Sequence, residues 1–422
     1  MYLMKKILIA NRGEIAIRIA RTCNDLGIKT IGVFSEDDLN SLHLSKMDES
    51  FMIDEKGASA YLNIKKIIEI AKSEKVDGIH PGYGFLSENP EFAKSAKRAR
   101  IKFIGPSEKS LMTFGDKSEA KQLATRLDIP VVRGTQGKTS LKQASTFFKG
   151  LKKNSSIVIK AIAGGGGRGM RVVNSESDLK DAMNRASSEA KSVFDSSDLY
   201  VEEYLKNYRH VEVQVLGDGK GQAIHMHERE CSTQRRHQKI LEIAPAPGMK
   251  KELKEKMLNA SVALIKESKY EGLATVEFLV DYSKEDFKFI ECNARLQVEH
   301  TVTEAVLGLD LVKAQIQISS GKTLKQLKLE QENIPEPKGF AIQSRVNMEV
   351  MDSEGETKPS GGKFTSFDLP SGPGVRSDSY GYSGYETNPA FDSLIAKVIT
   401  HSPEDNFKQA LKRNYRSLCE LK

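Results

Sequence analysis

Short apolar runs alternate with helical stripes of apolar residues along the first 115 positions of the chain. The runs at 6–10 (KILIA), 29–34 (KTIGVF) and 76–80 (VDGIH) have the length of buried strands. Between them, apolar residues recur three or four positions apart, which is the spacing of one helix face. This alternation predicts βαβ units around a parallel sheet. The two stripes are formed by Ile15, Ile19, Cys23 and Leu26, and by Ile64, Ile67, Ile68 and Ala71.

A polar loop rich in glycine, HPGYGFLSEN (His80–Asn89), follows the third of these strands. Sheets of this kind place ligands at the carboxyl ends of their strands, so the loop is a candidate for ligand contact. A purely structural turn fits the same pattern equally well. The first turn, ANRGEIA (Ala10–Ala16), lacks the GxGxxG spacing, which excludes the dinucleotide-binding fingerprint.

The pattern changes near residue 115, and positions 130–203 have the pattern of a small α+β unit. At its centre, strand character over Ile157–Ala163 runs into a glycine-rich stretch and returns over Met170–Val173. No GK[ST] sequence closes this stretch, which excludes a Walker loop. Backbone N–H groups of a glycine-rich tip can approach a polyphosphate closely, and Lys160 would add a point charge. We expect a hairpin that is mobile without nucleotide and orders over bound phosphates, although a flexible surface hairpin has the same signature.

Strict alternation of apolar and polar residues marks two further strands, His210–Gly217 and Gln222–Glu228. The next stretch, Arg229–Pro247, is polar and cationic and is predicted to be a loop. It is either a basic surface loop or a cluster of donors for a small oxyanion. Turn-rich segments at 355–364 and 370–385 predict short strands at the edge of a domain. The donors in the cationic stretch are Gln234, Arg235, Arg236, His237 and Lys239.

The most informative pattern is a pair of alternating runs, Thr275–Val280 and Phe287–Asn293, around a polar YSKED turn. It predicts an antiparallel hairpin in which Glu277 on one strand can converge with Glu291 and Asn293 on the other. Such carboxylate and amide oxygens suit Mg²⁺ or Mn²⁺, which also bind substrate phosphates. The alternative is a solvated hairpin, but varied polar side chains follow at once and favour a site. They are Arg295, Gln297, Glu299 and His300.

Composition limits the class of protein further. A chain of 422 residues with 39% hydrophobic and 29% charged residues is globular and long enough for two or three domains. No apolar run approaches the about 20 residues of a membrane span, and no signal-peptide cleavage site is found, so we expect a cytoplasmic protein without membrane contact. The four cysteines are far apart, which argues against a zinc cluster or a disulfide framework. The net charge of +7 is dispersed among acidic residues, which argues against nucleic-acid binding.

Taken together, these stretches resemble the biotin carboxylases, members of the ATP-grasp superfamily. The resemblance covers nearly the whole chain, from KKILIANRGEIAIRIAR to FDSLIAKVI. RRHQK, EIAPAP and NARLQVEHTVTE are its most specific parts, because ATP-grasp ligases that join carboxylates to amines share only the lid and metal residues. It implies an α/β and α+β fold with a Rossmann-like N-terminal domain (1–115) and an ATP-grasp region (116–330) whose lid spans about 130–203. The C-terminal part of the catalytic domain (331–422) is expected to be incomplete at Lys422.

The same resemblance implies a set of ATP-binding residues. Lys117 and Lys160 would hold the nucleotide phosphates, and Gly166 and Gly167 would close over them. The residues that border the adenosine would be Glu202, Glu203, Tyr204, Leu205 and His210, with Gln234 and His237 completing the ATP-binding set beside the bicarbonate pocket.

The resemblance also implies the catalytic residues. Glu299 matches the base that deprotonates bicarbonate, and Arg345 matches the residue that stabilises the biotin enolate. Bicarbonate attacks the γ-phosphate, carboxyphosphate breaks down to CO₂ and phosphate, and phosphate takes the ureido proton of biotin; cations stabilise the charge that develops. The metal ligands would be Glu277, Glu291 and Asn293, the bicarbonate pocket Lys239, Arg295, Gln297 and Val298, and the catalytic set Lys239, Arg295, Glu299 and Arg345.

Partners follow from the absence of an AMKM-like biotinylation site in the sequence, since the Met-Lys pairs at Met4 and Met249 stand in unsuitable contexts. Biotin therefore has to arrive on a separate carrier protein or domain. The final acceptor, whether acetyl-CoA, propionyl-CoA, pyruvate or another acid, belongs to a carboxyltransferase. We also expect a homodimer, from the family and from a polar helix face, predicted to be exposed, that carries Arg18, Arg21 and Asp25.

Two departures from the family pattern stand out. Ala163 replaces a common glycine, and VNMEVMD follows Arg345 in place of INAEDP, which alters the shell around that arginine. Two other functions stay open: an ATP-grasp ligase that joins a carboxylate to an amine, and a catalytically impaired nucleotide-binding scaffold. A requirement for bicarbonate separates the carboxylase from both.

Overall fold

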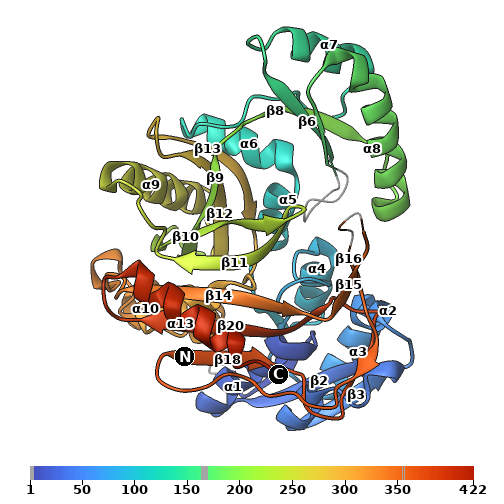
Figure 1. Cartoon of the computed structure of the whole chain (residues 1–422). Helices are drawn as coiled ribbons and strands as arrows, with labels where there is room; N and C mark the ends of the chain where they lie inside the picture. Colours follow the sequence, from blue (N-terminus) through green and yellow to red (C-terminus); the bar gives the residue numbers. More distant parts are fainter. Residues whose placement is uncertain (1–3, 163–169, 354, 356) are drawn as a thin grey trace.

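The computed structural model describes residues 4–162, 170–353, 355 and 357–422. Its first unit is the predicted parallel sheet, with strands in the order β3-β2-β1-β4-β5, drawn in blue in Figure 1. Asparagine, serine and aspartate side chains cap the starts of four of its helices, α3 to α6. The strands are β1 (Lys6–Ile9), β2 (Lys29–Ser35), β3 (Glu49–Ile53), β4 (Gly78–His80) and β5 (Lys102–Phe103). The helices are α1 (Gly13–Asp25), α2 (Ala58–Leu62), α3 (Ile64–Ser73), α4 (Pro90–Arg98), α5 (Glu108–Gly115) and α6 (Lys117–Arg126), with 3-10 turns η1 (Glu36–Asp38) and η2 (Leu42–Lys46).

The predicted α+β unit stands at the top of Figure 1 and is called the lid here. It is a three-stranded antiparallel sheet, β7-β6-β8, with two helices packed on it. Its apolar core is a separate cluster, which includes Ile157, Ile159, Leu199 and Val201. The predicted tip of the glycine-rich hairpin, at 163–169, lies outside the described residues. The lid elements are α7 (Leu141–Lys149), β6 (Ser156–Ala161), β7 (Arg171–Val173), η3 (Glu176–Asp178), α8 (Leu179–Phe194) and β8 (Leu199–Tyr204).

The central element is an antiparallel eight-stranded sheet in the order β13-β12-β9-β10-β11-β14-β20-β18. The last three strands come from the C-terminal part of the chain, and β14 pairs directly with β11, so one sheet continues across residue 330. Its strands are β9 (Arg209–Asp218), β10 (Ala223–Arg235), β11 (Gln238–Ala244), β12 (Glu271–Asp281), β13 (Asp286–Asn293), β14 (Phe340–Asn347), β18 (Val375–Ser379) and β20 (Leu394–Ser402). The helices are α9 (Lys251–Glu267), α10 (His300–Leu307), α11 (Leu311–Ser319), α12 (Leu324–Leu327) and α13 (Phe407–Cys419), with the turn η4 (Gln331–Asn333). The turn-rich segments carry short strands as predicted: β15 (Glu349–Met351), β16 (Thr357–Pro359), β17 (Gly362–Lys363) and β19 (Glu386–Thr387), besides the edge strand β18.

The cationic stretch Arg229–Pro247 is largely a strand hairpin, so the predicted loop is wrong. The end of β10 pairs antiparallel with β11 through a turn at Arg236 and His237, both with positive φ. The hydrophobic signal of a strand is weak here because two of its inward positions, Lys239 and Glu242, carry charges that pair inside the protein.

The N-terminal unit is joined to the central sheet by a shared core. Leu8 and Ile79 of the parallel sheet belong to the same buried cluster as Val213 and Phe278 of the central sheet. The first helix also contributes a buried cation rather than the exposed one that was predicted. Arg18 is only 7% exposed, because it pairs with two acidic side chains that follow it in the central region. Those partners are Glu304 Oε1 at 2.6 Å and Asp310 Oδ1 at 2.8 Å.

None of the helices in the described part of the chain is both long enough and apolar enough to cross a lipid bilayer.

Candidate active site

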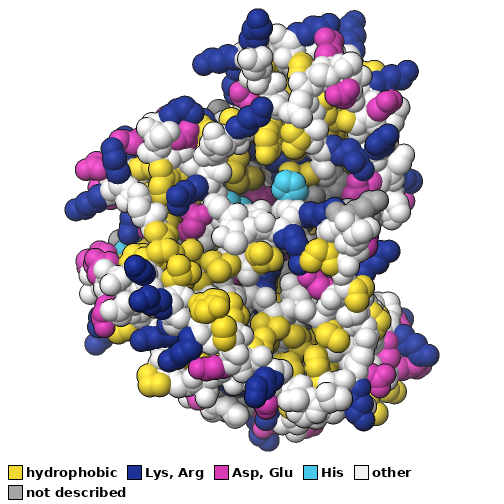
Figure 2. Space-filling model, in the orientation of Figure 1, with side chains coloured by type: hydrophobic (Ala, Val, Ile, Leu, Met, Phe, Trp, Pro, Cys, Tyr) yellow, Lys and Arg dark blue, Asp and Glu magenta, His cyan; other side chains and the backbone are white. Residues whose placement is uncertain are grey.

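The predicted hairpin is present. Strands β12 and β13 pair antiparallel, with Glu277 opposite Glu291 and Thr275 opposite Asn293. They form one end of the central sheet, below the lid (Figure 1). The face of the molecule seen in Figure 2 is hollowed below the lid, and Lys, Arg and His side chains surround the hollow. Opposed residues of an antiparallel pair point to the same side, so the hairpin brings both predicted metal carboxylates to one face.

Glu277 is the centre of the polar contacts on that face. Its Oε1 accepts hydrogen bonds from Asn293 Nδ2 at 2.8 Å, Lys239 Nζ at 3.0 Å and Gln297 Nε2 at 3.0 Å. Its Oε2 lies 2.7 Å from His210 Nε2. Burial opposes ionisation of Glu277, but Lys239 and His210 outweigh it and hold the pKa of the carboxyl well below its usual range. Glu277 is therefore a carboxylate near neutral pH.

Lys239 enters from β11 and holds three carboxylates. Its Nζ lies 2.5 Å from Glu212 Oε2, 3.0 Å from Glu277 Oε1 and 2.7 Å from Glu299 Oε1. Burial opposes the charge on Lys239, but the three glutamates outweigh it and raise the pKa of the ammonium well above its usual value. One fixed positive charge thus lies at the point where three acidic side chains converge.

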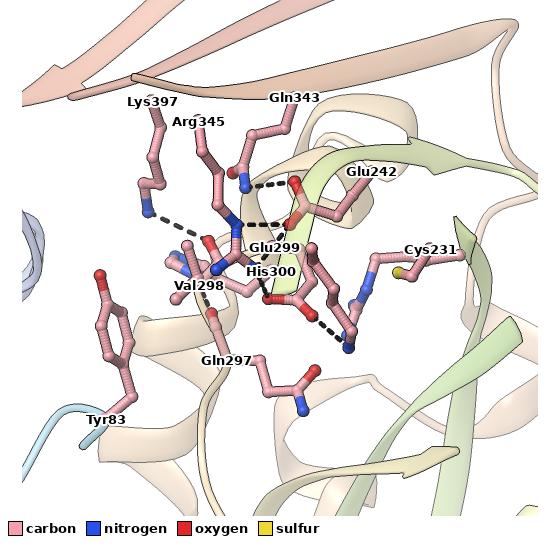
Figure 3. Close-up of polar contacts among 12 residues, drawn as sticks. Tyr83, Cys231, Glu242, Gln297, Val298, Glu299, His300, Gln343, Arg345 and Lys397 are labelled. Atoms are coloured by element: carbon pink, nitrogen blue, oxygen red, sulfur yellow. Dashed lines mark hydrogen bonds and ion pairs between the residues drawn. The ribbon is translucent and has the colours of Figure 1, made fainter. Parts of the chain in front are cut away.

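Glu299 contacts both Lys239 and Arg345. Figure 3 shows Glu299 beside Arg345. Its second oxygen, Oε2, lies 3.2 Å from an Nη atom of Arg345. Arg345 in turn donates from Nε to Glu242 Oε1 at 2.6 Å, and Gln343 donates to the other oxygen of Glu242 at 2.8 Å. Burial opposes ionisation of Glu299, but Lys239 and Arg345 outweigh it and lower the pKa of its carboxyl below the ordinary range. The predicted base is therefore charged and held at both oxygens.

The backbone beside Glu299 is held from the opposite side. Lys397, which is fully buried on β20, donates to the carbonyl oxygen of Val298 at 3.1 Å (Figure 3). The same ammonium lies 3.0 Å from Glu14 Oε2 on α1, and the hydroxyl of Tyr83 donates to the other oxygen of Glu14. Helix α1 of the N-terminal unit thus supports the segment that carries the base.

Arg295 is held by three acceptors. Its Nε donates to Glu88 Oε2 at 2.7 Å, and its two Nη atoms donate to Asn293 Oδ1 at 3.2 Å and to the carbonyl oxygen of Leu296 at 3.3 Å. Burial opposes the charge, but Glu88 outweighs it and raises the pKa of the guanidinium. Glu88 lies in the loop 80–89, so that loop contacts the candidate site and is more than a structural turn.

Three lysines gather where the lid meets α6. Lys117 Nζ lies 3.3 Å from Glu291 Oε2, and Lys160 Nζ lies 2.6 Å from Glu202 Oε2, while Lys121 pairs with the other oxygen of Glu202. Burial and the charge of Lys117 lower the pKa of Lys160 to about 8, and burial with Lys160 lowers the pKa of Lys121 to about 7. Burial also opposes the charge on Lys117, but Glu291 outweighs it and raises the pKa. Clustered ammonium groups of this kind favour the entry of a polyanion.

The other predicted nucleotide residues lie in several parts of the chain, and only some of them contact one another. His210 and Gln234 contact each other, with Nδ1 and Nε2 2.9 Å apart, and His210 reaches Glu277 at the predicted metal residues. His237 is exposed at the turn between β10 and β11. Gly166 and Gly167 lie outside the described residues. At the end of β8 the structure places Glu202, which is buried, followed by Glu203, Tyr204 and Leu205.

The donor set fits a hard divalent cation. Ligand atoms of His210, Glu212 and Glu277 all lie within 4.8 Å of one another, and Glu291 and Asn293 stand on the neighbouring strand. Carboxylate and amide oxygens dominate this group, as Mg²⁺ and Mn²⁺ prefer. The predicted trio of Glu277, Glu291 and Asn293 has Glu277 in common with this group. His210 and Glu212, on strand β9, were not among the predicted metal ligands.

A fully buried arginine links the site to the sheet behind it. Arg229 Nε lies 2.5 Å from Glu212 Oε1, and one Nη donates to Gln214 Oε1 at 2.7 Å and to Thr303 Oγ1 at 2.9 Å. The other Nη donates to Thr275 Oγ1 at 3.2 Å. Glu212 is therefore shared by two cations, Arg229 and Lys239, and cannot move without disturbing both.

Sequence reasoning missed several of these residues. Glu212 could have been found, because the alternation in HVEVQV places it in line with His210 on one face of β9. Lys121 lies four residues after Lys117 on α6 and hence on the same helix face. Glu88 and Glu242 carried no local signal, since their partners lie far away in the sequence.

Family models match most of the chain. The biotin carboxylase N-terminal domain matches residues 3–111, the ATP-binding domain of the carbamoyl-phosphate synthase large chain matches 116–327, and the biotin carboxylase C-terminal domain matches 343–422.

Curated relatives and solved structures agree with these matches. The chain is 42% identical to biotin carboxylase 1 of Bacillus subtilis over 99% of its own length and 91% of that protein. It is 45% identical to pyruvate carboxylase of Staphylococcus aureus, of which it spans 36%. The biotin carboxylase domain dimer of Hydrogenobacter thermophilus 2-oxoglutarate carboxylase, solved with MgADP, ADP and bicarbonate, superposes with a TM-score of 0.94 at 38% identity, covering 100% of this chain and 91% of that one. A Campylobacter jejuni biotin carboxylase bound to an ATP ligand gives a TM-score of 0.93 at 40% identity, with 100% and 92% coverage. The predicted fold class and family are thereby confirmed: the chain belongs to the biotin carboxylases, ATP-dependent ligases of the ATP-grasp superfamily.

Proposed function

We propose that this chain uses ATP and bicarbonate to carboxylate biotin presented by a separate carrier. The observation that carries the proposal is Glu299, a buried carboxylate held 2.7 Å from Lys239 and 3.2 Å from Arg345. An anionic base flanked by two fixed cations suits a reaction in which a small anion is deprotonated and negative charge then moves to a second substrate. Family membership supports the same activity.

At the nucleotide end, Lys117 and Lys160 bind the phosphates of ATP. Glu277, Glu291 and Asn293 would hold Mg²⁺ or Mn²⁺, and the metal, when bound, neutralises charge on the β- and γ-phosphates. Phosphate oxygens replace the carboxylates that these lysines contact without nucleotide. The end of β8 and the side chains of His210 and Gln234 complete the nucleotide site.

At the bicarbonate end, the anion lies among Lys239, Arg295, Gln297 and the backbone of Val298. Gln297 Oε1 is buried and has no hydrogen-bond partner among the described residues, so it can accept a hydrogen bond from the hydroxyl group of bicarbonate. Glu299 then removes that proton, and a bicarbonate oxygen forms a bond to the γ-phosphorus as the bond to ADP breaks. The product, carboxyphosphate, separates into CO₂ and phosphate.

At the biotin end, phosphate takes the proton from the ureido nitrogen of biotin. The nitrogen then bonds to the carbon of CO₂. Arg345 stabilises the negative charge on the ureido oxygen, and Glu242 fixes the direction of its guanidinium through the 2.6 Å contact at Nε.

The proposed partners are a biotin carrier protein or domain and a carboxyltransferase. The chain spans about a third of the length of the pyruvate carboxylases it matches, 36% in the Staphylococcus aureus protein, so the complete reaction and its acceptor lie beyond this half-reaction. A homodimer is also proposed, supported by the dimeric Hydrogenobacter thermophilus domain. Arg18 is buried and gives that interface no exposed charge, which leaves Arg21 and Asp25 on the same helix. A cytoplasmic location is proposed from the sequence.

The deciding experiment measures ADP release by the chain with ATP, Mg²⁺, bicarbonate and free biotin, each of the last two omitted in turn. A biotin carboxylase requires bicarbonate and is stimulated by biotin. Turnover that persists unchanged without bicarbonate contradicts the proposal and favours an amine ligase, and no turnover under any condition favours a scaffold.

A further inference from the structure

Arg295 donates three hydrogen bonds to other groups of the protein before any substrate is bound. A guanidinium offers five N–H donors in a rigid fork. In this structure Nε binds Glu88, and each Nη atom has one protein acceptor, Asn293 or Leu296. Three donors thus fix the plane of the guanidinium, and two remain for a ligand. Among the three contacts, only the one with Glu88 is between opposite charges.

Glu88 is placed by a loop that is itself anchored. The amide of Asn11 donates to the carbonyl oxygens of Pro81 at 2.7 Å and Tyr83 at 2.8 Å, which holds the start of the loop. Its end is fixed by Asn89, which caps helix α4 by accepting a hydrogen bond from Phe92 N. The loop is therefore held on both sides of the glutamate.

Glu88 accepts hydrogen bonds from two consecutive residues of the segment that follows β13. Its Oε2 accepts from Arg295 Nε at 2.7 Å, and its Oε1 accepts from the backbone N–H of Ala294 at 3.2 Å. The side chain of Glu88 is 41% exposed and that of Arg295 is 22% exposed, so the contact lies at the edge of the site and not in a core. Its removal therefore leaves a partly exposed guanidinium behind and not a fully buried one.

We propose that Glu88 is a positioning residue for bicarbonate binding, which acts by holding Arg295 in the orientation that receives the anion. The inference rests on the proposed function. Glu88 touches the arginine through Nε and leaves the outer edge of the fork for the substrate. The N-terminal unit thereby supplies a side chain on which the chemistry in the central sheet depends, although it provides no group that reacts.

Glu88 could also weaken bicarbonate binding, so the direction in which the KM for bicarbonate changes distinguishes the two effects. A carboxylate beside a guanidinium lowers the positive potential that attracts bicarbonate, so removing it could tighten binding. Positioning predicts a higher KM for bicarbonate when Glu88 is removed, whereas competition predicts a lower one. The magnitude favours positioning, because misplacing a substrate-binding group by about 1 Å can cost on the order of 100-fold in rate.

The experiment compares Glu88→Ala and Glu88→Gln with the parent chain in bicarbonate-dependent ADP release. We expect the KM for bicarbonate to rise about 10-fold or more in Glu88→Ala and less in Glu88→Gln, which can still accept one hydrogen bond, with the KM for ATP within about 2-fold. The matched control is Glu91→Gln on α4, an exposed carboxylate that pairs only weakly with Lys94 and Arg98 among its described contacts.

Repeating the Glu88 substitution in a protein that already carries Arg295→Lys separates positioning of Arg295 from a general structural effect. In an Arg295→Lys variant the ammonium cannot be held at Nε, so adding Glu88→Ala should raise the KM for bicarbonate by less than 2-fold further. An unchanged or lower KM in the Glu88 single variants overturns the inference while the proposed function stands. A parent that shows no bicarbonate requirement overturns both.

Discussion

The sharpest test of the proposed chemistry is Glu299→Gln. Glutamine keeps the length and shape of the side chain and can still accept hydrogen bonds from Lys239 or Arg345. It cannot take a proton from bicarbonate. The substitution therefore removes base function and leaves the surroundings nearly unchanged, so a loss of turnover reports on proton transfer.

The expected loss follows from the size of general base catalysis. Removing such a group lowers the rate by about 100- to 10,000-fold. At about 1.36 kcal/mol per tenfold, this raises the activation free energy by about 2.7 to 5.4 kcal/mol. The affinity for ATP should change by less than about 2-fold, because the side chains proposed to bind its phosphates contact other acids.

The loss of stability should be limited, because neither cation loses all its partners. Lys239 keeps Glu212 at 2.5 Å, and Arg345 keeps Glu242 at 2.6 Å. The contacts weakened at Glu299 are one charged hydrogen bond and one longer pair, so the free energy of unfolding should fall by about 1 to 3 kcal/mol.

The assay is ADP release at saturating ATP and bicarbonate, with and without biotin, together with calorimetric ATP binding. Glu332→Gln, an exposed substitution on η4, serves as the control for handling and concentration. Glu299→Gln with activity within about 3-fold of the parent, in a protein that still requires bicarbonate, would refute the assignment of Glu299 as the base.

Three further outcomes are expected. Arg345→Ala should bind ATP as the parent does but lose its stimulation by biotin in the ADP-release assay; retained stimulation contradicts the role of the arginine. Glu212→Gln should lower the free energy of unfolding by about 3 to 5 kcal/mol in urea titrations followed by circular dichroism, because it leaves Arg229 buried without its carboxylate. A loss below about 1 kcal/mol would show that the other partners suffice. Nucleotide binding should take up protons above about pH 8 and weaken as pH rises, because the pKa of Lys160, about 8 without ligand, increases beside phosphate. Calorimetry at pH 8.5 in two buffers of different ionisation enthalpy measures this uptake, and no uptake contradicts it.

The hairpin at the centre of the site could be predicted because residues two apart share a face, which puts Thr275 with Glu277 on β12 and Glu291 with Asn293 on β13. The exact pairing of Glu277 with Glu291 also depends on a register shift between Glu277 and Phe278, which the alternation does not reveal. The hairpin of β10 and β11 was missed for the opposite reason. Lys239 and Glu242 point inward with charges that pair only across the folded molecule, and in sequence they look like a solvated loop.

Contacts between distant segments set the limit of prediction. Glu88 and Arg295 are 207 positions apart, and no local pattern joins them. The burial of Arg18 was not predicted either, because its partners Glu304 and Asp310 are nearly 300 positions later in the sequence. The family pattern predicts roles for the site residues, but it did not predict the acidic side chains that hold them in place.

The pairing of β11 with β14 has a practical consequence for dissecting this protein. A fragment that ended at residue 330 would lose β14, β20 and β18, and would expose the whole backbone edge of β11 to solvent. An open edge of that kind recruits strands from other molecules and promotes aggregation. Such a fragment would also leave Glu242 without the guanidinium of Arg345. Expression of the ATP-binding part alone should therefore give an insoluble product, and any shortened version has to keep the strands that close the sheet.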